Sequence, residues 1–185
     1  FIKNLLEPSM EFAKKDVADV YAFAKKNGFE DSQLQSWDFS YWSEKYQQAE
    51  YSLSAEELKP YFQLESCIDA VLGLATRLYG ITFKELDDVP VYHPDVKVYE
   101  VNDADGRHLA LFYADFFPRA SKRGGAWMTE FRGQSIRNGV EYRPFISTVM
   151  NFTKPTADAP ALITHDELVT FLHEFGHALH GIFAE

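Results

Sequence analysis

The stretch His173-Glu174-Phe175-Gly176-His177 carries two histidines four residues apart with a glutamate between them. A helix turns about 100° per residue, so the two histidines would lie one turn apart on the same face. Both imidazoles could then reach a single zinc ion. Glu174 would lie at the flank of that face, where it can accept a proton from a zinc-bound water instead of binding the metal. The spacing therefore predicts His173 and His177 as zinc ligands and Glu174 as a general base.

The residues around this motif predict the helix that presents it. Thr164 followed by Glu167 is a capping box, and the acidic pair at 166–167 suits the first turn of a helix. Apolar residues recur at helical spacing along one arc and comprise Leu168, Phe171, Leu172, Phe175, Ala178, Leu179, Ile182 and Phe183. His173 and His177 fall opposite that arc, so we expect them to point away from the packed face.

The five-residue motif is not sufficient evidence for a metal site. A His-Glu-x-x-His string also arises by chance, and a pair of surface histidines is usually only solvated. The capping box and the apolar arc favour a metal site because they agree with it independently. The elongated metzincin signature needs a Gly and a His where this chain has His180 and Phe183, so that class is excluded. What remains is a gluzincin, in which a glutamate on a later helix is the third ligand.

Composition limits the other function classes. The chain has 185 residues, of which 46% are hydrophobic, and a formal net charge of −10. The acidic balance argues against nucleic acid and against a membrane surface, and the sequence has no apolar run of about 18 residues. Cys67 is the single cysteine, which excludes an internal disulfide and favours a cytoplasmic, reducing compartment with Cys67 as a buried, inert thiol. Because the chain starts at Phe1 without a methionine, we expect a piece of a longer polypeptide.

Residues 1–90 predict helices. Apolar spacing indicates one helix or two over 1–26, with Pro8 as a break or kink. An aromatic-rich stretch over 37–50 predicts another helix whose aromatic side chains belong to the core. A buried stripe over 64–79 predicts a further helix that ends at a glycine.

Residues 91–160 change to short β-rich runs. Residues 96–101 and 109–117, separated by a polar turn, predict a hairpin. The glycine-containing stretch 122–125 is interpreted as a mobile loop, and 145–153 as another strand with alternating faces. The expected fold class is therefore α+β, mainly α, with helices and a small, mostly antiparallel sheet. Residues 161–185 supply the metal helix.

Several separate blocks of the sequence resemble one family. Its carriers, in chain order, are Tyr92-His93-Pro94-Asp95-Val96, Glu100-Val101, Asp105-Gly106, Phe112-Tyr113-Ala114-Asp115, Lys122-Arg123-Gly124-Gly125-Ala126-Trp127-Met128, Asn151-Phe152-Thr153-Lys154-Pro155-Thr156 and the run from His165 to Gly181. Over nearly its whole length the chain resembles the zinc oligopeptidases of the thimet oligopeptidase family, and within it the bacterial peptidyl-dipeptidases (dipeptidyl carboxypeptidases) and oligopeptidase A. The resemblance implies a mostly helical peptidase with a deep channel that admits only short peptides.

The resemblance also implies roles for single residues. His173 and His177 match the family's first two zinc ligands, and Glu174 matches its catalytic glutamate. The family's third ligand is a glutamate about two dozen residues beyond the second histidine, past the end of this chain. We therefore expect residues 1–185 to be part of a catalytic domain that is inactive by itself and holds zinc weakly or not at all.

The expected activity of the intact enzyme is release of dipeptides from the carboxyl end of short peptides, by a monomeric cytoplasmic protein. Internal cleavage stays open, as does the activity of a different gluzincin such as an aminopeptidase. A non-catalytic helical scaffold or peptide-binding module that keeps the motif is the alternative from another class. Neither side-chain preference nor oligomeric state follows from the residues.

The strand predicted at 145–153 supplies the expected substrate contact. We expect it to form a sheet edge over the metal helix and to pair with extended peptide through its backbone, with Val149, Met150 and Asn151 nearest. The alternative is an ordinary interior strand.

Overall fold

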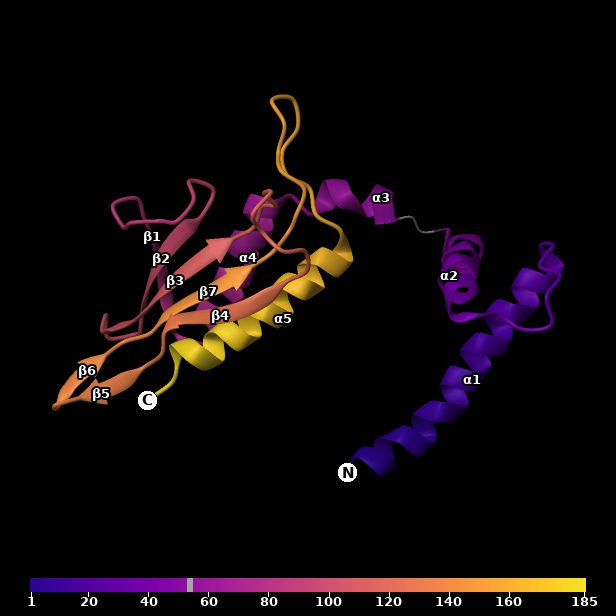
Figure 1. The fold of residues 1–185 in the computed structure, drawn as a ribbon, viewed down its shortest axis with the longest axis horizontal. Helices are drawn as coiled ribbons and strands as arrows, with labels where there is room; N and C mark the ends of the chain where they lie inside the picture. The colour runs from indigo at the N-terminus through magenta and orange to yellow at the C-terminus, as the bar shows by residue number, and fades with distance from the viewer. Residues whose placement is uncertain (53–54) are drawn as a thin grey trace. The chain divides into compact units, whose positions relative to one another are not determined.

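The computed structural model describes residues 1–52 and 55–185, and the chain divides into two compact units, residues 1–57 and 58–185. Figure 1 shows the helices and strands of both units. None of the helices in the described ranges is long and apolar enough to cross a membrane.

The N-terminal unit is a pair of helices, α1 (Ile2–Lys26) and α2 (Ser36–Tyr51). α1 continues through Pro8, so the predicted break there is wrong. The helices meet through aromatic rings, since Phe23 lies 6.4 Å from Trp42 and 5.4 Å from Tyr46 between ring centroids. In the described part of the chain no residue of α2 is buried, and Trp37 is 74% exposed, so the prediction that these aromatic residues are core is wrong.

Three helical segments follow: α3 (Ala55–Leu58), the 3-10 turn η1 (Lys59–Tyr61) and α4 (Leu64–Tyr79). Ser54 and Glu57 have the spacing of a further capping box, but Ser54 lies outside the described residues. α4 ends where predicted, at Gly80, whose φ of 72° lies in the left-handed region that favours glycine. Cys67 of α4 is buried, and burial raises the pKa of its thiol.

The C-terminal unit contains a five-stranded sheet in the order β1-β2-β3-β7-β4. The strands are β1 (Thr82–Leu86), β2 (Lys97–Asn102), β3 (His108–Asp115), β4 (Trp127–Arg132) and β7 (Phe145–Val149). Every neighbouring pair is antiparallel except β3 and β7. The predicted hairpin is confirmed as β2 and β3, and the chain is α+β with a small, mostly antiparallel sheet.

A separate two-stranded ribbon, β5 (Ser135–Arg137) with β6 (Val140–Tyr142), lies between β4 and β7 in the chain. Two strands of the five-stranded sheet, β1 and β4, are not predicted by the sequence analysis. β1 lies inside the part expected to be helical up to residue 90, and β4 follows directly on the glycine-containing loop.

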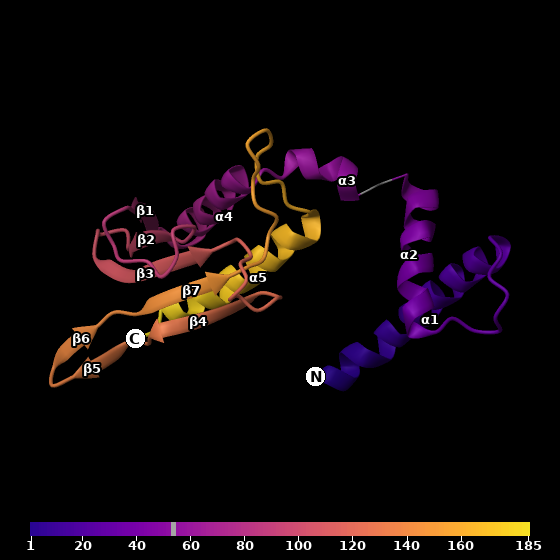
Figure 2. The same cartoon turned by 45° about the horizontal axis from the view of Figure 1, so that its top comes forward.

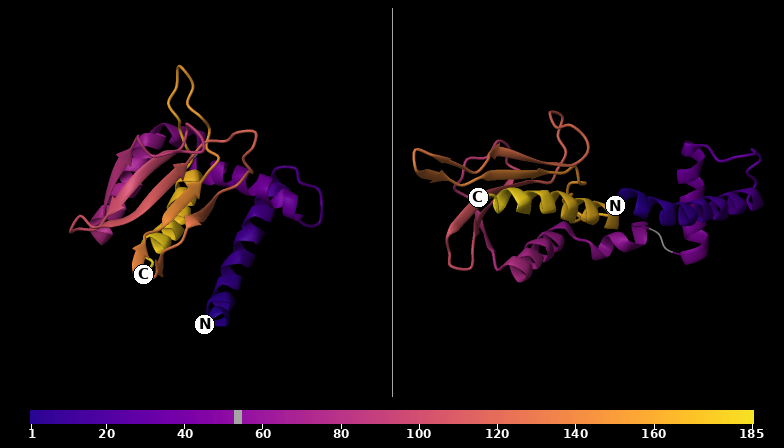
Figure 3. Two further views of the ribbon diagram at one scale, coloured as in Figure 1. Left: turned by 60° about the vertical axis from the view of Figure 1, so that its left-hand side comes forward. Right: turned by 90° about the horizontal axis from the view of Figure 1, so that it is seen from below.

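The two long helices of this unit, α4 and α5 (His165–Ile182), pack on one face of the sheet. The core contains Phe171, Phe175, Ala178 and Ile182 of α5, and the strands contribute Phe112, Ala114 and Ile146 to it. Figures 2 and 3 show α5 running along the sheet next to β4 and β7. The predicted apolar arc is therefore what fixes the metal helix to the sheet.

Both ends of α5 are held by polar contacts. At its start the Thr164 hydroxyl accepts a hydrogen bond from the Glu167 amide at 3.1 Å, and the Glu167 carboxylate accepts one from the Thr164 amide at 2.7 Å, which confirms the capping box. At its end the Arg143 guanidinium donates to the carbonyls of Ile182 and Ala184 at 2.9 and 3.1 Å, and to that of Leu109 on β3 at 2.8 Å. The helix is thus fixed along its axis as well as on its face.

β7 is an interior strand. It pairs with β3 on one side and β4 on the other, so its backbone donors and acceptors are used within the sheet. The prediction that residues 145–153 form a sheet edge is therefore wrong. The alternation of β7 does not distinguish an edge from an interior position, because both bury one face of side chains and differ only in backbone pairing.

Candidate metal centre and the strand beside it

The two histidines of α5 are exposed and close together, as the sequence predicts. The Nε2 atoms of His173 and His177 lie 3.2 Å apart, and the ring planes meet at 79°. Two nitrogens bound to one zinc at about 2.0–2.1 Å in tetrahedral geometry would be about 3.3 Å apart. The histidine pair therefore fits two corners of a zinc site in the conformation that the structure shows.

Glu174 lies between the histidines on α5 and is half-buried. At 100° per residue it projects to the flank of the histidine face, the position of a base rather than a third ligand. Within residues 1–52 and 55–185, no group of three or more His, Cys, Asp or Glu side chains is placed to hold a metal ion. The histidine pair would supply two of the three protein ligands that a catalytic zinc site uses.

α5 lies against two neighbouring strands of the sheet. α5 contacts both β4 and β7, and Figure 1 shows α5 and β4 running side by side toward the β5–β6 ribbon. The helix approaches both strands closely at Gly181, where a Cβ atom would lie 2.7 Å from Cδ1 of Ile146 on β7 and 3.3 Å from Oε1 of Glu130 on β4. His173 precedes Gly181 by eight residues, about 12 Å of helix, which a strand covers in three to four residues. The turn from His173 to His177 therefore lies level with the first residues of β4 along the helix axis.

β4 is also an edge of the sheet. One side of it pairs with β7, and within the described residues its other side pairs with no strand. Trp127, Thr129 and Phe131 point to the face opposite the helices, whereas Met128 packs against the core. The sequence analysis missed this strand, although the stretch from Trp127 to Phe131, which follows two glycines and Ala126, is a signal that could have found a strand there.

The three predicted substrate-binding residues have different surroundings. Val149 ends β7 and faces away from the helices, while Met150 is fully buried and its amide donates to the Asp115 carbonyl at 2.8 Å. The Asn151 side-chain amide donates to the carbonyls of Arg123 and Gly125 at 3.0 and 2.7 Å. Substrate binding by Val149, Met150 and Asn151 stays a prediction, and strand addition along β7 cannot be its mechanism.

A second polar cluster lies on the opposite face of the sheet, around Asp115, which is 1% exposed. Arg119 donates two hydrogen bonds to its carboxylate, both at 2.9 Å, and Lys122 and the Tyr92 hydroxyl donate at 2.9 and 3.0 Å. Burial by itself would raise the pKa of Asp115, but the bonds from Arg119 and Lys122 outweigh it and the pKa is lowered. Burial raises the pKa of Tyr92 to about 12.

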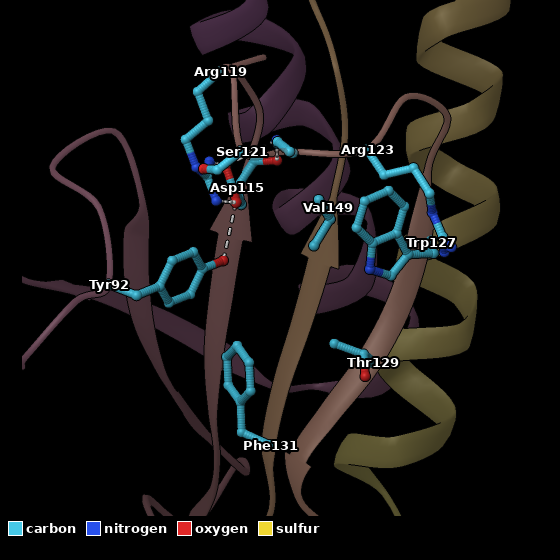
Figure 4. A pocket seen from close by; sticks show the side chains of 10 residues that line it. Tyr92, Asp115, Arg119, Ser121, Arg123, Trp127, Thr129, Phe131 and Val149 are labelled. Atoms are coloured by element: carbon cyan, nitrogen blue, oxygen red, sulfur yellow. Dashed lines mark hydrogen bonds and ion pairs between the residues drawn. The ribbon is translucent and has the colours of Figure 1, made fainter.

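This cluster forms one wall of a cavity of about 440 Å³ (Figure 4). Tyr92 and Asp115 stand on one side, Arg123 and Trp127 stand on the other, and Val149 lies between them. The Arg123 guanidinium lies 5.4 Å from the Trp127 ring centroid. The charges of Asp115, Arg119 and Lys122 are paired with one another, so this cluster fastens the loop between β3 and β4.

Comparison with known proteins identifies the family of the whole chain. The model of peptidase family M3 matches residues 1–185. The chain belongs to this family. It is 42% identical over 187 residues to the dipeptidyl carboxypeptidase of Salmonella typhimurium, covering 100% of the chain and 27% of that protein. It is 41% identical over 181 residues to oligopeptidase A of Escherichia coli, covering 97% of the chain and 26% of that protein.

A plant member of the M3 family, the probable cytosolic oligopeptidase A of Arabidopsis thaliana, is 41% identical over 185 residues, with 96% of the chain and 26% of that protein covered. The chain thus spans about a quarter of the length of these curated relatives. The match confirms the predicted kinship with dipeptidyl carboxypeptidases and oligopeptidase A.

Proposed function

We propose that the protein containing this chain is a zinc-dependent peptidase that hydrolyses short peptides. The observation that carries the proposal is the 3.2 Å separation of the His173 and His177 Nε2 atoms, with Glu174 on the flank of the same helix. Membership of peptidase family M3 and similarity to proteins named dipeptidyl carboxypeptidase support it. Release of dipeptides from the carboxyl end is the specific activity that we propose.

His173 and His177 would hold the zinc ion, together with a carboxylate from outside the described residues. Bound zinc would lower the pKa of a coordinated water and polarise the scissile carbonyl. Glu174 would accept the proton of the attacking water and then give it to the leaving amine, which lets a single carboxylate act as base and as acid. The packed arc of α5 keeps both histidines on the exposed side of the helix, with Glu174 at the flank.

The peptide would bind along β4 instead of β7. Extended peptides commonly add a strand to an exposed sheet edge, with main-chain hydrogen bonds that tolerate different side chains. β4 offers such an edge level with the turn from His173 to His177, whereas the backbone of β7 is paired on both sides. We therefore expect broad side-chain tolerance in a peptide of limited length.

The test uses the complete polypeptide and the blocked peptide N-acetyl-Ala-Ala-Ala-Ala. Removal of metal with 1,10-phenanthroline should abolish hydrolysis, and added zinc should restore it. Mass spectrometry should find Ala-Ala as the product of the carboxyl end. Release of single residues from unblocked Ala-Ala-Ala-Ala would favour an aminopeptidase, and zinc-replete protein that hydrolyses neither peptide would favour a peptide-binding module.

The isolated 185-residue chain should be catalytically inactive and should bind zinc weakly, because two imidazoles lack the charge and the third bond of a carboxylate. We further propose that the intact protein is cytoplasmic and monomeric and binds neither nucleic acid nor membrane. Zinc titration of this chain beside the complete protein tests the first point. Measurable hydrolysis by the zinc-loaded chain would contradict it.

A further inference from the structure

The loop between β3 and β4, residues 116–126, is fastened to the sheet at its first half. Lys122, whose side chain is 2% exposed, donates to the Asp115 carbonyl at 3.0 Å and to the Phe117 carbonyl at 2.8 Å, besides its bond to the Asp115 carboxylate. Arg119 holds the same carboxylate from the exposed side. The buried Lys122 and the two hydrogen bonds from Arg119 anchor this half of the loop. The prediction of a mobile loop at 122–125 is therefore wrong at Lys122.

Its second half is fastened by Asn151 alone among the hydrogen bonds that the described residues show. One Nδ2 atom donates to the Arg123 carbonyl at 3.0 Å and to the Gly125 carbonyl at 2.7 Å. Gly125 has φ of 96°, a conformation that side-chain-bearing residues rarely adopt, so the chain turns sharply between these two carbonyls. Two residues later β4 begins.

The loop determines where β4 starts, and β4 starts level with the turn from His173 to His177 along the helix axis. A shift of the Arg123 to Gly125 backbone would therefore move the first pairing positions of the edge strand relative to His173 and His177. In catalysis a misplacement of about 1 Å can cost about 100-fold in rate.

We propose that Asn151 is a positioning residue for substrate, which acts by holding the start of β4 in register with the metal helix. This inference deepens the proposed function and rests on it, because the position of β4 matters for catalysis only if the peptide pairs with β4. In this role the Asn151 amide contacts loop carbonyls and not the peptide. The sequence pattern predicts substrate contact for Asn151, whereas the structure assigns its side chain to the loop that precedes the contact strand.

The experiment compares Asn151→Asp with Asn151→Ser in the complete polypeptide. Asn151→Asp keeps the shape but replaces both donors with a carboxylate that faces two carbonyl oxygens, whereas Asn151→Ser keeps one donor and adds no charge. Asn102→Asp, on β2 at the far side of the sheet, controls for the added charge. For N-acetyl-Ala-Ala-Ala-Ala, we expect KM to rise about tenfold or more in Asn151→Asp and less in Asn151→Ser, with the zinc dissociation constant within about twofold of wild type.

A second measurement, also on the complete polypeptide, does not depend on activity. Amide hydrogen exchange should accelerate about tenfold or more at residues 123–128 in both Asn151 variants, with little change in α5. If wild-type protein lacks peptidase activity while exchange still accelerates at 123–128, the proposed function fails and the anchoring stands. Unchanged exchange at 123–128 would overturn the inference, as would an unchanged KM or a loss of zinc affinity that parallels the loss of activity.

Discussion

Two polar clusters lie on opposite faces of one small sheet and differ in how their charges are used. Around Asp115, which is 1% exposed, the Arg119 guanidinium and the Lys122 ammonium both donate hydrogen bonds to the carboxylate. On α5, His173 and His177 are exposed, and their Nε2 atoms lie 3.2 Å apart. Buried charges that are paired stabilise a local structure, whereas exposed donors that converge can bind a ligand. Substitutions in the Asp115 cluster should therefore lower the stability of the fold, whereas substitutions of the histidines should lower metal binding and leave the stability almost unchanged.

The largest effect is expected at the metal-binding side. Glu174→Gln in the complete polypeptide should lower kcat by about 10² to 10⁴, because the amide cannot accept the proton of the attacking water. Zinc content, measured by atomic absorption, should stay near wild type, since Glu174 is not a ligand. Near-normal turnover of this variant would remove Glu174 from the mechanism.

The next effect is expected on stability, on the other face. Asp115→Asn should destabilise the chain by about 3–5 kcal/mol, because it leaves buried Lys122 and partly buried Arg119 without their counter-ion. Urea unfolding followed by circular dichroism measures the change, with exposed Asp158→Asn as the matched control. A loss below about 1 kcal/mol would mean that the paired cluster contributes little.

The pH dependence of that difference follows from the lowered pKa of Asp115. A carboxyl whose pKa is lower in the folded state stabilises the fold above its unfolded value of about 4, and the contribution is lost as pH falls through the folded pKa. The stability gap between wild type and Asp115→Asn should therefore be constant from about pH 5 to 7 and should shrink below about pH 4. A gap that grows on acidification would contradict this sign.

A smaller loss is expected at the end of the metal helix. Arg143→Gln should cost about 1–3 kcal/mol, because the carbonyls of Leu109, Ile182 and Ala184 lose their donor. Arg137→Gln, on the exposed β5–β6 ribbon, is the matched control. Equal urea midpoints for the two variants would show that water replaces the Arg143 contacts without loss.

The smallest effect on stability is expected at the histidines themselves. His173→Ala in the 185-residue chain without metal should change the free energy of unfolding by no more than about 0.5 kcal/mol, because the side chain is exposed. The same variant of the complete protein should lose zinc. A large loss of stability in the metal-free chain would mean that the pair has a structural role.

Elements whose signals are local can be predicted from the residues alone. The capping box from Thr164 to Glu167, the apolar arc of α5 and the spacing of His173 and His177 are set within one helix, where each residue's direction follows from about 100° per position. The hairpin of β2 and β3 is likewise set by its strands and the turn between them. The structure has these features in the places where the sequence predicts them.

The packing of distant segments decides which strand is an edge, which aromatic residues are buried and what Asn151 contacts. An alternating strand pattern shows which face is buried and does not show how many neighbours the backbone has, so β7 and β4 cannot be told apart as interior and edge from their residues. The aromatic residues of α2 have core spacing but lie in a unit where no partner in the described residues buries them. The bonds from Asn151 to the carbonyls of Arg123 and Gly125 join positions 28 and 26 residues apart, and such pairings arise only when packing brings distant backbone together.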